Sequence, residues 1–360
     1  MDVGAPKPMQ TFRIETAGHA SRPSAAIMVA VLLVGVVLPA FASRDQIQNL
    51  IFLFYMIALA QCWNLLAGFA GLISVGQQAF VGLGGYLLFA LTLPGGVNPL
   101  LAIPLAGIIS AALALPTALV VFRLRGAYFA IGTWVVAEVY RLVFAQFKAL
   151  GGGTGTSLDP LVTSSVPGIE WVKTLLGVRT PAARDIISYW MVLALMAGTL
   201  ALVCFMLRSR RGLALGAIRD SESAAAGLGV DIHRVKLGVY IATAAMTGMI
   251  GALIYLQKAR ISPDAAFSVL DWTAYVIFIT VIGGIGTIEG PMIGAVIFYL
   301  MQRYLADFGA WYLILLGALG IFVMLFAPKG LWGFVSERYN LTLFATRRRL
   351  IVGAKDGDRG

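Results

Sequence analysis

The sequence is poor in charge, cysteine and histidine, and each shortage bears on a class of protein. Charged residues make up 12% of the 360 positions, about half the share typical of a soluble domain. Hydrophobic residues make up 59%, more than a soluble core absorbs. The only cysteines, Cys62 and Cys204, lie in apolar stretches, so a disulfide framework is not expected. His19 and His233 each stand alone, so we expect no metal site.

The motifs of the common nucleotide-binding and hydrolytic sites are also missing. No G-x-x-x-x-G-K-[ST] segment is present, so the chain cannot cradle ATP phosphates in a P-loop. The glycines of 151–155 lack the lysine of that motif. Neither H-E-x-x-H nor G-x-S-x-G occurs, and these are the zinc-protease and nucleophile-elbow signatures. We therefore expect no catalytic residue and no cofactor in this chain.

What the sequence has instead is a series of long apolar runs. Lipid offers the backbone no hydrogen-bond partner, so such runs cross a membrane as helices. The sequence predicts an all-α, polytopic transmembrane helical bundle of about ten spans. The expected spans are 25–42, 47–67, 72–93, 99–122, 126–147, 185–207, 237–257, 272–288, 290–306 and 310–327.

Lysine and arginine are distributed unevenly between these runs. The net charge is +10, and basic residues favour cytoplasmic loops. Basic positions occur before the first span, after the fourth, after the sixth and after the tenth. All four places fall on one side of the membrane if every run crosses it. The pattern predicts that both termini are cytoplasmic.

Three parts of this topology leave alternatives open. The first run resembles a signal peptide, but its length favours an uncleaved helix. The third contains Ser74, Gln77, Gln78 and several glycines, which suggests a broken or re-entrant span. The eighth and ninth meet at the glycine-rich stretch 283–291. A re-entrant hairpin there lowers the count to eight.

The runs also define the predicted domain boundaries. Residues 1–24 form a cytoplasmic N-terminal segment, 25–333 the transmembrane domain and 334–360 a basic cytoplasmic tail. Within the domain lie an outer loop, 148–184, with a short interfacial helix near Trp171, and an inner loop, 208–236. The tail is either solvated or attracted to anionic membrane lipid. The charge distribution gives no reason to expect nucleic acid as a partner.

The inner loop is the most informative segment. Asp220 or Ser221 is suited to cap a short helix there, and Gly227 or Gly229 to end it. Helical spacing predicts one face made of small and apolar residues, which are Ala214, Ile218, Ser221, Ala225 and Leu228. A short helix held between two spans can dock into a cytoplasmic partner. An amphipathic turn lying on the lipid surface is the alternative interpretation.

At these residues the chain resembles a known family, the LivM-type permease subunits of branched-chain amino acid ABC importers. The resemblance covers most of the chain from about Leu50 to Gly333, with its motifs in family order. It rests on the stretches Asn64–Phe80, Arg125–Thr133 with Glu138, Ala217–Glu222 leading to Gly229, Val281–Pro291 and Phe326–Trp332.

The resemblance implies a set of partners and a coupling loop. The partners are a second, LivH-like permease, two ATP-binding cassette subunits that bind the ATP, and a periplasmic substrate-binding protein. The implied coupling residues are Arg219, Asp220, Ser221, Glu222, Ala224, Ala225 and Gly229. Two positions depart from the family pattern. Ser223 holds the place of the usual acid, with Glu222 one residue early, and Gln77 replaces a familiar histidine.

Polar residues inside the spans are candidates for the translocation path. They are Asn64, Gln77, Gln78, Glu138 and Arg141. An ionisable residue at membrane depth usually faces protein or a water-filled cavity. Glu138 and Arg141 also have the spacing of a local ion pair. For the amides, hydrogen bonding between helices is the alternative to substrate contact.

The sequence thus predicts a permease subunit, not an enzyme, in a bacterial inner membrane. It serves an ATP-driven importer of branched-chain or other small amino acids. One alternative keeps the architecture and changes the cargo to urea, short amides or aromatic acids. Another is an ion-driven secondary transporter, for which Glu138 is the clear buried acid. An intramembrane enzyme is the most distant alternative.

Overall fold

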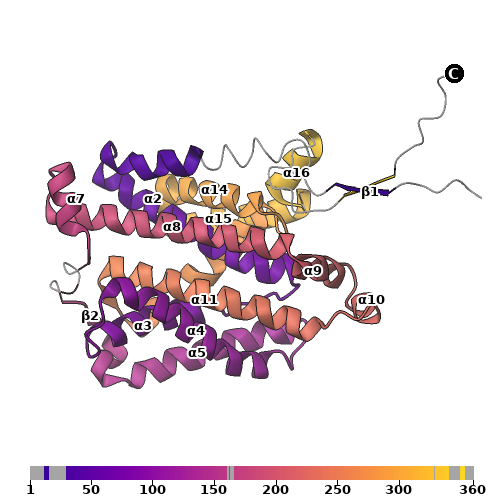
Figure 1. Ribbon diagram of the computed structural model, residues 1–360, viewed down its shortest axis with the longest axis horizontal. Coiled ribbons are helices and arrows are strands. Elements are labelled where there is room, and N and C mark those ends of the chain that lie inside the picture. The colour runs from indigo at the N-terminus through magenta and orange to yellow at the C-terminus, as the bar shows by residue number, and fades with distance from the viewer. Residues whose placement is uncertain are drawn as a thin grey trace, which may run out of the picture.

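The computed structural model describes residues 12–15, 30–159, 162, 166–327, 329–339 and 349–352. They form an elongated bundle whose long helices run side by side (Figure 1). Seven helical stretches in the described residues are long and apolar enough to cross a membrane. They are Arg44–Phe69, Pro99–Val121, Ala127–Gln146, Thr180–Arg208, Ile232–Lys258, Pro263–Gly283 and Trp311–Ser336. The prediction of a helical, multi-pass membrane protein is confirmed.

The named helices of the bundle follow the expected spans. In chain order they are α2 (Arg44–Asn64), α3 (Gln77–Thr92), α4 (Pro99–Val121), α5 (Ala127–Gln146), α8 (Thr180–Arg208), α11 (Ile232–Lys258), α13 (Tyr275–Gly283), α14 (Glu289–Leu305) and α15 (Ala310–Phe326). A shorter apolar helix, Ala30–Ala40, precedes them. Helix α3, helix α14 and this first helix are shorter than the seven long stretches. The number of complete crossings therefore stays a prediction.

The third expected span is interrupted where polar residues and glycines predicted a break. Helix α2 continues into a wide turn, Leu65–Phe69, and residues 71–76 are not helical before α3 begins at Gln77. With 16 residues, α3 is about 24 Å long at 1.5 Å per residue. That is shorter than the roughly 30 Å hydrocarbon core.

The junction between α13 and α14 is a tight turn, as its glycines predicted. Helix α13 ends at Gly283 and α14 begins at Glu289. Gly284 and Gly286 have φ angles of 132° and 75°, a region that favours glycine. A Cβ at Gly68 would lie 2.6 Å from the Gly286 nitrogen. The turn and the end of α2 therefore pack backbone against backbone.

The interior is organised around α2 and α11. Helix α11 packs against α3 and α4, while α2 packs against α8, α13 and α14. Helices α4, α5 and α15 keep broad apolar faces exposed, with side chains such as Leu119, Trp134 and Phe322. Exposed apolar surface of that extent is typical of a chain that meets lipid or a partner protein.

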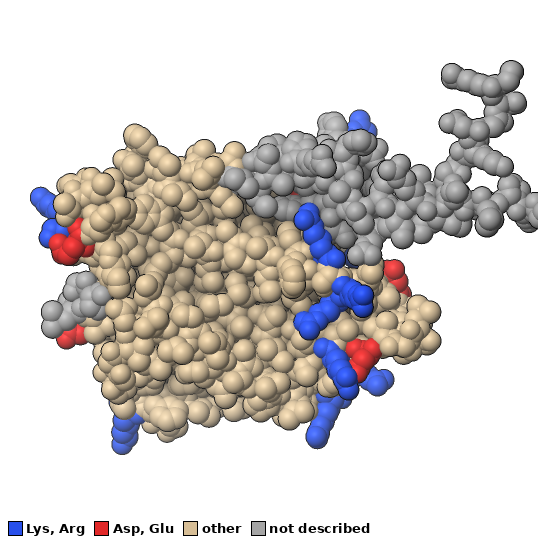
Figure 2. All heavy atoms as spheres, in the orientation of Figure 1, with Lys and Arg blue, Asp and Glu red and all other residues tan. Residues whose placement is uncertain are grey.

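The two ends of the bundle differ in charge. One carries α9 (Arg210–Asp220) and α10 (Glu222–Gly227), and lysines and arginines gather around it (Figure 2). We call it the basic end. The opposite end, the far end, carries α7 (Ile169–Leu176) and the paired strands β2 (Thr156–Ser157) and β3 (Arg260–Ile261) (Figure 1). A short helix is therefore present where one was expected near Trp171, as α7, and its place at the membrane interface stays a prediction.

The far end also holds short elements that tie the long helices together. The single-turn helices Lys148–Leu150 and Gly152–Thr154 follow α5, and α12 (Pro263–Ala266) follows β3. The wide turn Leu270–Ala274 leads into α13. Asp185 at the start of α8 is buried and accepts hydrogen bonds from Arg44 at 2.6 Å and Gln48 at 3.2 Å. This contact joins α8 to α2.

The chain termini are described only in part. Strand β1 (Phe12–Glu15) pairs antiparallel with β4 (Arg349–Val352), and α16 (Gly330–Tyr339) follows α15. The rest of the expected segments 1–24 and 334–360, and the start of the first expected span, lie outside the described residues.

Candidate functional site

The inner loop folds into the two short helices of the basic end. The Ser209 hydroxyl caps α9, and the Ser221 hydroxyl accepts a hydrogen bond from the Ala224 N–H at 3.3 Å to cap α10. Helix α10 ends at Gly227, and Gly229 follows with a φ of 81°. Of the caps and stops considered in the sequence, the chain uses Ser221 and Gly229, because the N–H groups of Gly229 and Val230 bond back to the carbonyls of Ala226 and Ala225.

The prediction that the inner loop forms one continuous helical face is wrong, because the helix is interrupted. Ser221 has an extended backbone, with φ −163° and ψ 116°, so the helix breaks there and its two parts point differently. Ile218 and Ala225 are buried, whereas Leu228 is 80% exposed. Two faces result, one packed on the bundle and one open to solvent.

The seven predicted coupling residues stay together on α9, α10 and the turn that follows. Glu222 pairs with Lys236 of α11 at 2.5 Å, which ties α10 to a long helix. Arg219 and Asp220 are 3.9 Å apart. Ala225 anchors α10, while Ser221, Glu222, Ala224 and Gly229 are exposed. Their role in coupling stays a prediction.

Helix α9 faces the glycine turn between α13 and α14. A cavity of about 90 Å³ separates them, with Phe69, Leu215, Arg219 and Gly286 in its lining. The exposed helix pair is therefore next to a turn that joins two long helices.

Asn64, a predicted path residue, reaches the same turn. It is fully buried, its amide donates to the Thr287 carbonyl at 2.7 Å, and its oxygen accepts from the Gly286 N–H at 2.8 Å. Gln61 donates to the Ile288 carbonyl at 2.5 Å. Both side chains hold the turn to α2.

Gln77 and Gln78, at the start of α3, are also buried between helices. Gln77 donates to the Leu59 carbonyl at 2.9 Å. The Gln78 side-chain oxygen accepts from the Thr273 hydroxyl, and the Gln78 backbone N–H donates to the same hydroxyl oxygen at 3.2 Å. Within the described part of the chain, one amide atom of each glutamine has no partner. Their contacts are those of interhelical hydrogen bonds.

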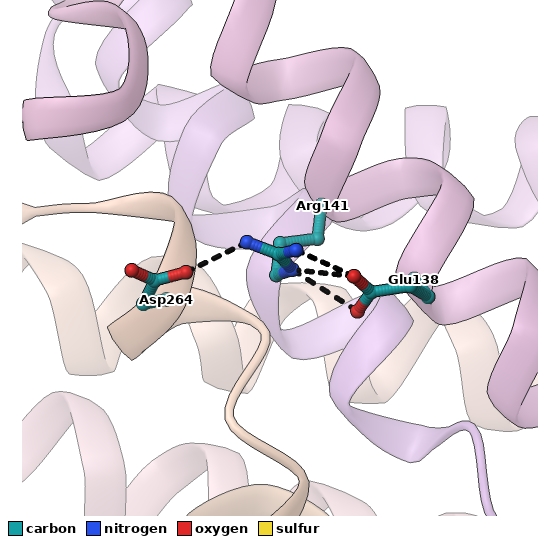
Figure 3. Close-up of polar contacts among 3 residues, drawn as sticks. All are labelled: Glu138, Arg141 and Asp264. Atoms are coloured by element: carbon teal, nitrogen blue, oxygen red, sulfur yellow. Dashed lines mark hydrogen bonds and ion pairs between the residues drawn. The ribbon is translucent and has the colours of Figure 1, made fainter.

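Glu138 and Arg141 lie together on α5, as their spacing suggested. Arg141 Nε contacts both Glu138 oxygens at 2.9 and 3.0 Å, and Arg141 Nη2 lies 2.5 Å from Oε1. Arg141 Nη1 reaches Asp264 Oδ1 of α12 at 2.7 Å. Figure 3 shows the guanidinium between the two carboxylates. We call these residues the Arg141 cluster.

Sequence reasoning missed Asp264 and the partners of the amides. Asp264 follows Ser262 and Pro263, a helix-start pattern that explains the acid locally without any distant partner. Thr273 and the turn carbonyls carry no signal of their own. These residues lie 123 to 227 positions in the sequence from the side chains that they bond, and the fold brings the two partners together.

These features together define a class of protein. The chain is a multi-pass integral membrane protein with apolar exposed helices. It has an exposed helix pair at its basic end and ion-paired charges on α5. That class is a multi-pass membrane protein with a helix pair that projects from one end of the bundle.

Comparison with known proteins names the family. Residues 44–324 match the family described as branched-chain amino acid transport system / permease component, and the chain belongs to that family. It is 29% identical to the high-affinity branched-chain amino acid transport system permease protein LivM of Salmonella typhimurium and to that of Escherichia coli. Each alignment covers 84% of this chain and 74% of the relative.

A more distant relative comes from an archaeon. The chain is 22% identical to the probable branched-chain amino acid transport permease protein LivH of Methanocaldococcus jannaschii, over 71% of this chain and 82% of the relative. No solved structure matches. The resemblance first drawn from the motifs is confirmed.

Proposed function

We propose that this chain is a permease subunit of an ATP-driven importer for branched-chain or other small amino acids, located in a bacterial inner membrane. The observation that carries the proposal is the α9–α10 pair, held on the bundle by Ala225 and Lys236 and open on the side of Leu228. Family membership supports it. The cargo is the one named for the relatives.

The proposed topology has ten spans with both termini in the cytoplasm. The basic end then faces the cytoplasm, because lysine and arginine favour that side, and the far end faces outward. The pairing of β1 with β4 supports termini on one side. The permease domain is residues 25–333, with loops 148–184 outside and 208–236 inside.

ATP is bound by partner subunits in this proposal, since the chain holds no P-loop motif. Two ATP-binding cassettes dock on the permease pair, one of them on α9 and α10 through the exposed faces of Arg219, Asp220, Ser221, Glu222, Ala224 and Gly229. A second, LivH-like permease completes the membrane part, and a periplasmic binding protein delivers substrate. Membrane lipid covers the remaining apolar surface.

Coupling follows from where the helix pair rests. A cassette that moves α10 also moves α9, which contacts the Leu65–Phe69 turn at the end of α2 and faces the Gly286 turn across the cavity. Asn64 and Gln61 fasten that turn to α2. The states of the cassette therefore bias the long helices between inward-open and outward-open arrangements.

The test uses the complete transporter in proteoliposomes. Glu222→Arg breaks the pair with Lys236 and inverts the charge of α10, and Gly229→Trp adds bulk at a positive φ. We expect either change to abolish substrate-stimulated ATP hydrolysis while the chain still inserts. Arg234→Glu is the matched control, since Arg234 is an exposed charge of the same end on α11. Normal stimulated hydrolysis in Glu222→Arg and Gly229→Trp would overturn the docking role.

The open alternatives give different results in the same assay. An ion-driven transporter continues uptake in proteoliposomes that lack the cassette subunits. An importer of urea, short amides or aromatic acids retains stimulated hydrolysis, but with those cargoes and not with amino acids.

A further inference from the structure

Residues 71–76, which we call the unwound segment, run back along α2 into the bundle. Helix α2 and the wide turn that continues it end beside α9, at the basic end. From there the chain returns toward the middle of α2, because the Gln77 amide donates to the Leu59 carbonyl at 2.9 Å. The Trp63 indole N–H donates to the Ser74 carbonyl at 2.8 Å. The unwound segment therefore lies beside the half of α2 that is nearer the basic end.

The contacts with α2 place part of the unwound segment at membrane depth. The stretch Arg44–Phe69 has 26 residues and is about 39 Å long at 1.5 Å per residue. The hydrocarbon core is about 30 Å thick, and the ion-paired Arg44 lies at its edge or outside it. A core of that thickness reaches at least to Asn64, about 30 Å along the helix. The levels of Leu59 and Trp63 therefore lie within the core.

The backbone of the unwound segment keeps polar groups without partners. The Val75 N–H donates to the Thr133 hydroxyl at 3.0 Å, and the Gly76 N–H donates to the Ser74 hydroxyl at 3.1 Å. Among the described residues, no hydrogen bond engages the N–H or the carbonyl of Ile73, the N–H of Ser74 or the carbonyl of Val75. Unpaired backbone groups at this depth do not face hydrocarbon.

The unwound segment also lies open on one side of this chain. On its packed side, the Thr133 carbonyl of α5 leaves no room for a Cβ on Gly76. On its open side, Ile73 is 57% exposed and Gly71 is exposed as well. Something other than lipid must therefore meet the segment there.

Water fits the open side better than a helix of a partner does. A membrane-spanning helix pairs its own backbone groups internally, so it offers few donors or acceptors to a neighbour. Water supplies both. Irregular backbone at membrane depth is tolerated where it lines a water-filled cavity, and in transporters interrupted helices form substrate sites in this way.

We propose that the unwound segment lines the water-filled route by which the amino acid crosses the membrane. Its free N–H groups serve the carboxylate of the cargo and its free carbonyls serve the ammonium group, so the segment needs no ionisable side chain. The Ile73 side chain borders the route, and α5 forms the adjoining wall. The inference rests on the proposed function, since it takes an amino acid as the cargo.

The experiment measures how fast a cysteine at Ile73 reacts with methanethiosulfonate ethyltrimethylammonium, a charged thiol reagent. The complete complex is held in nanodiscs, without nucleotide and with ATP, and Cys62 and Cys204 of this chain are replaced by alanine. Electrophoresis then separates the chain from its partners. Because the reactive thiolate forms in water and not in hydrocarbon, we expect Ile73→Cys to react about tenfold faster than Ile108→Cys in at least one state. Ile108 is the matched control, an isoleucine 64% exposed within the regular helix α4.

Uptake separates a transport route from a merely wet surface. Ile73→Trp adds bulk beside the unwound segment and should lower leucine uptake into proteoliposomes several-fold at equal amounts of complex, whereas Ile108→Trp should leave it unchanged. Unchanged uptake in Ile73→Trp would overturn the route. So would Ile73→Cys that reacts no faster than Ile108→Cys in either state of a complex that imports leucine, because lipid or a partner then covers the segment. A wild-type complex that imports no amino acid with ATP and binding protein contradicts the proposed function instead.

Discussion

The polar residues inside the spans fall into two groups that differ in their surroundings. Asn64, Gln77 and Gln78 are buried between helices and bond to backbone or to a threonine. Glu138 and Arg141 lie on the surface of α5 and bond to each other and to Asp264. The same apolar setting in the sequence therefore conceals two roles. In these two groups, the uncharged amides join helices within the chain, whereas Glu138 and Arg141 lie on the surface of α5.

The largest effect is expected at the most buried amide. Asn64→Leu removes the partners of the Gly286 N–H and the Thr287 carbonyl. Two fully buried groups left without partners cost about 2–6 kcal/mol together. The Gly286 N–H and the Thr287 carbonyl are only partly buried, so unfolding should become easier by roughly 2–4 kcal/mol. Denaturant unfolding of the purified chain in detergent measures this. The control is Asn49→Leu, on the same helix, where the partly exposed Asn49 side chain donates to Asp45.

If Asn64→Leu lowers the unfolding free energy no more than the control does, the claim that the buried amides join helices is contradicted. Water or lipid would then satisfy the backbone groups of the turn as well as Asn64 does.

A much smaller effect on stability is expected at the exposed charge. Glu138→Gln keeps the side-chain volume and one acceptor for Arg141, and exposed ion pairs contribute about 0–1 kcal/mol. The unfolding free energy of the isolated chain should change by less than about 1 kcal/mol. The same unfolding experiment measures it. A loss as large as that of Asn64→Leu would show that the cluster fastens α5 to α12 rather than facing water.

The positions of the long helices were predictable because their signal is local. Hydropathy predicted where the described long helices lie, as for α4 at 99–121 against an expected 99–122. Glycine likewise predicted both interruptions, since backbone freedom is a property of the residue itself. The N-cap at Ser221 was predictable for the same reason.

Contacts across the sequence were beyond local reasoning. Asn64 and Thr287 are 223 positions apart, and Arg141 and Asp264 are 123 apart. Nothing near Asp264 distinguishes a helix-start acid from a partner of Arg141. Regular helical spacing likewise predicted one face for the inner loop, but Ser221 ends α9 and caps α10, and its extended backbone divides that face in two.

The most direct test of the account is the side of the membrane on which α10 lies. A cysteine placed at Ser223, in a chain whose Cys62 and Cys204 are replaced by alanine, is treated in intact cells with a membrane-impermeant thiol reagent. The account predicts no labelling until the inner membrane is permeabilised, and strong labelling afterwards. Labelling of Ser223→Cys in intact cells would place the helix pair outside and contradict a permease driven from the cytoplasm.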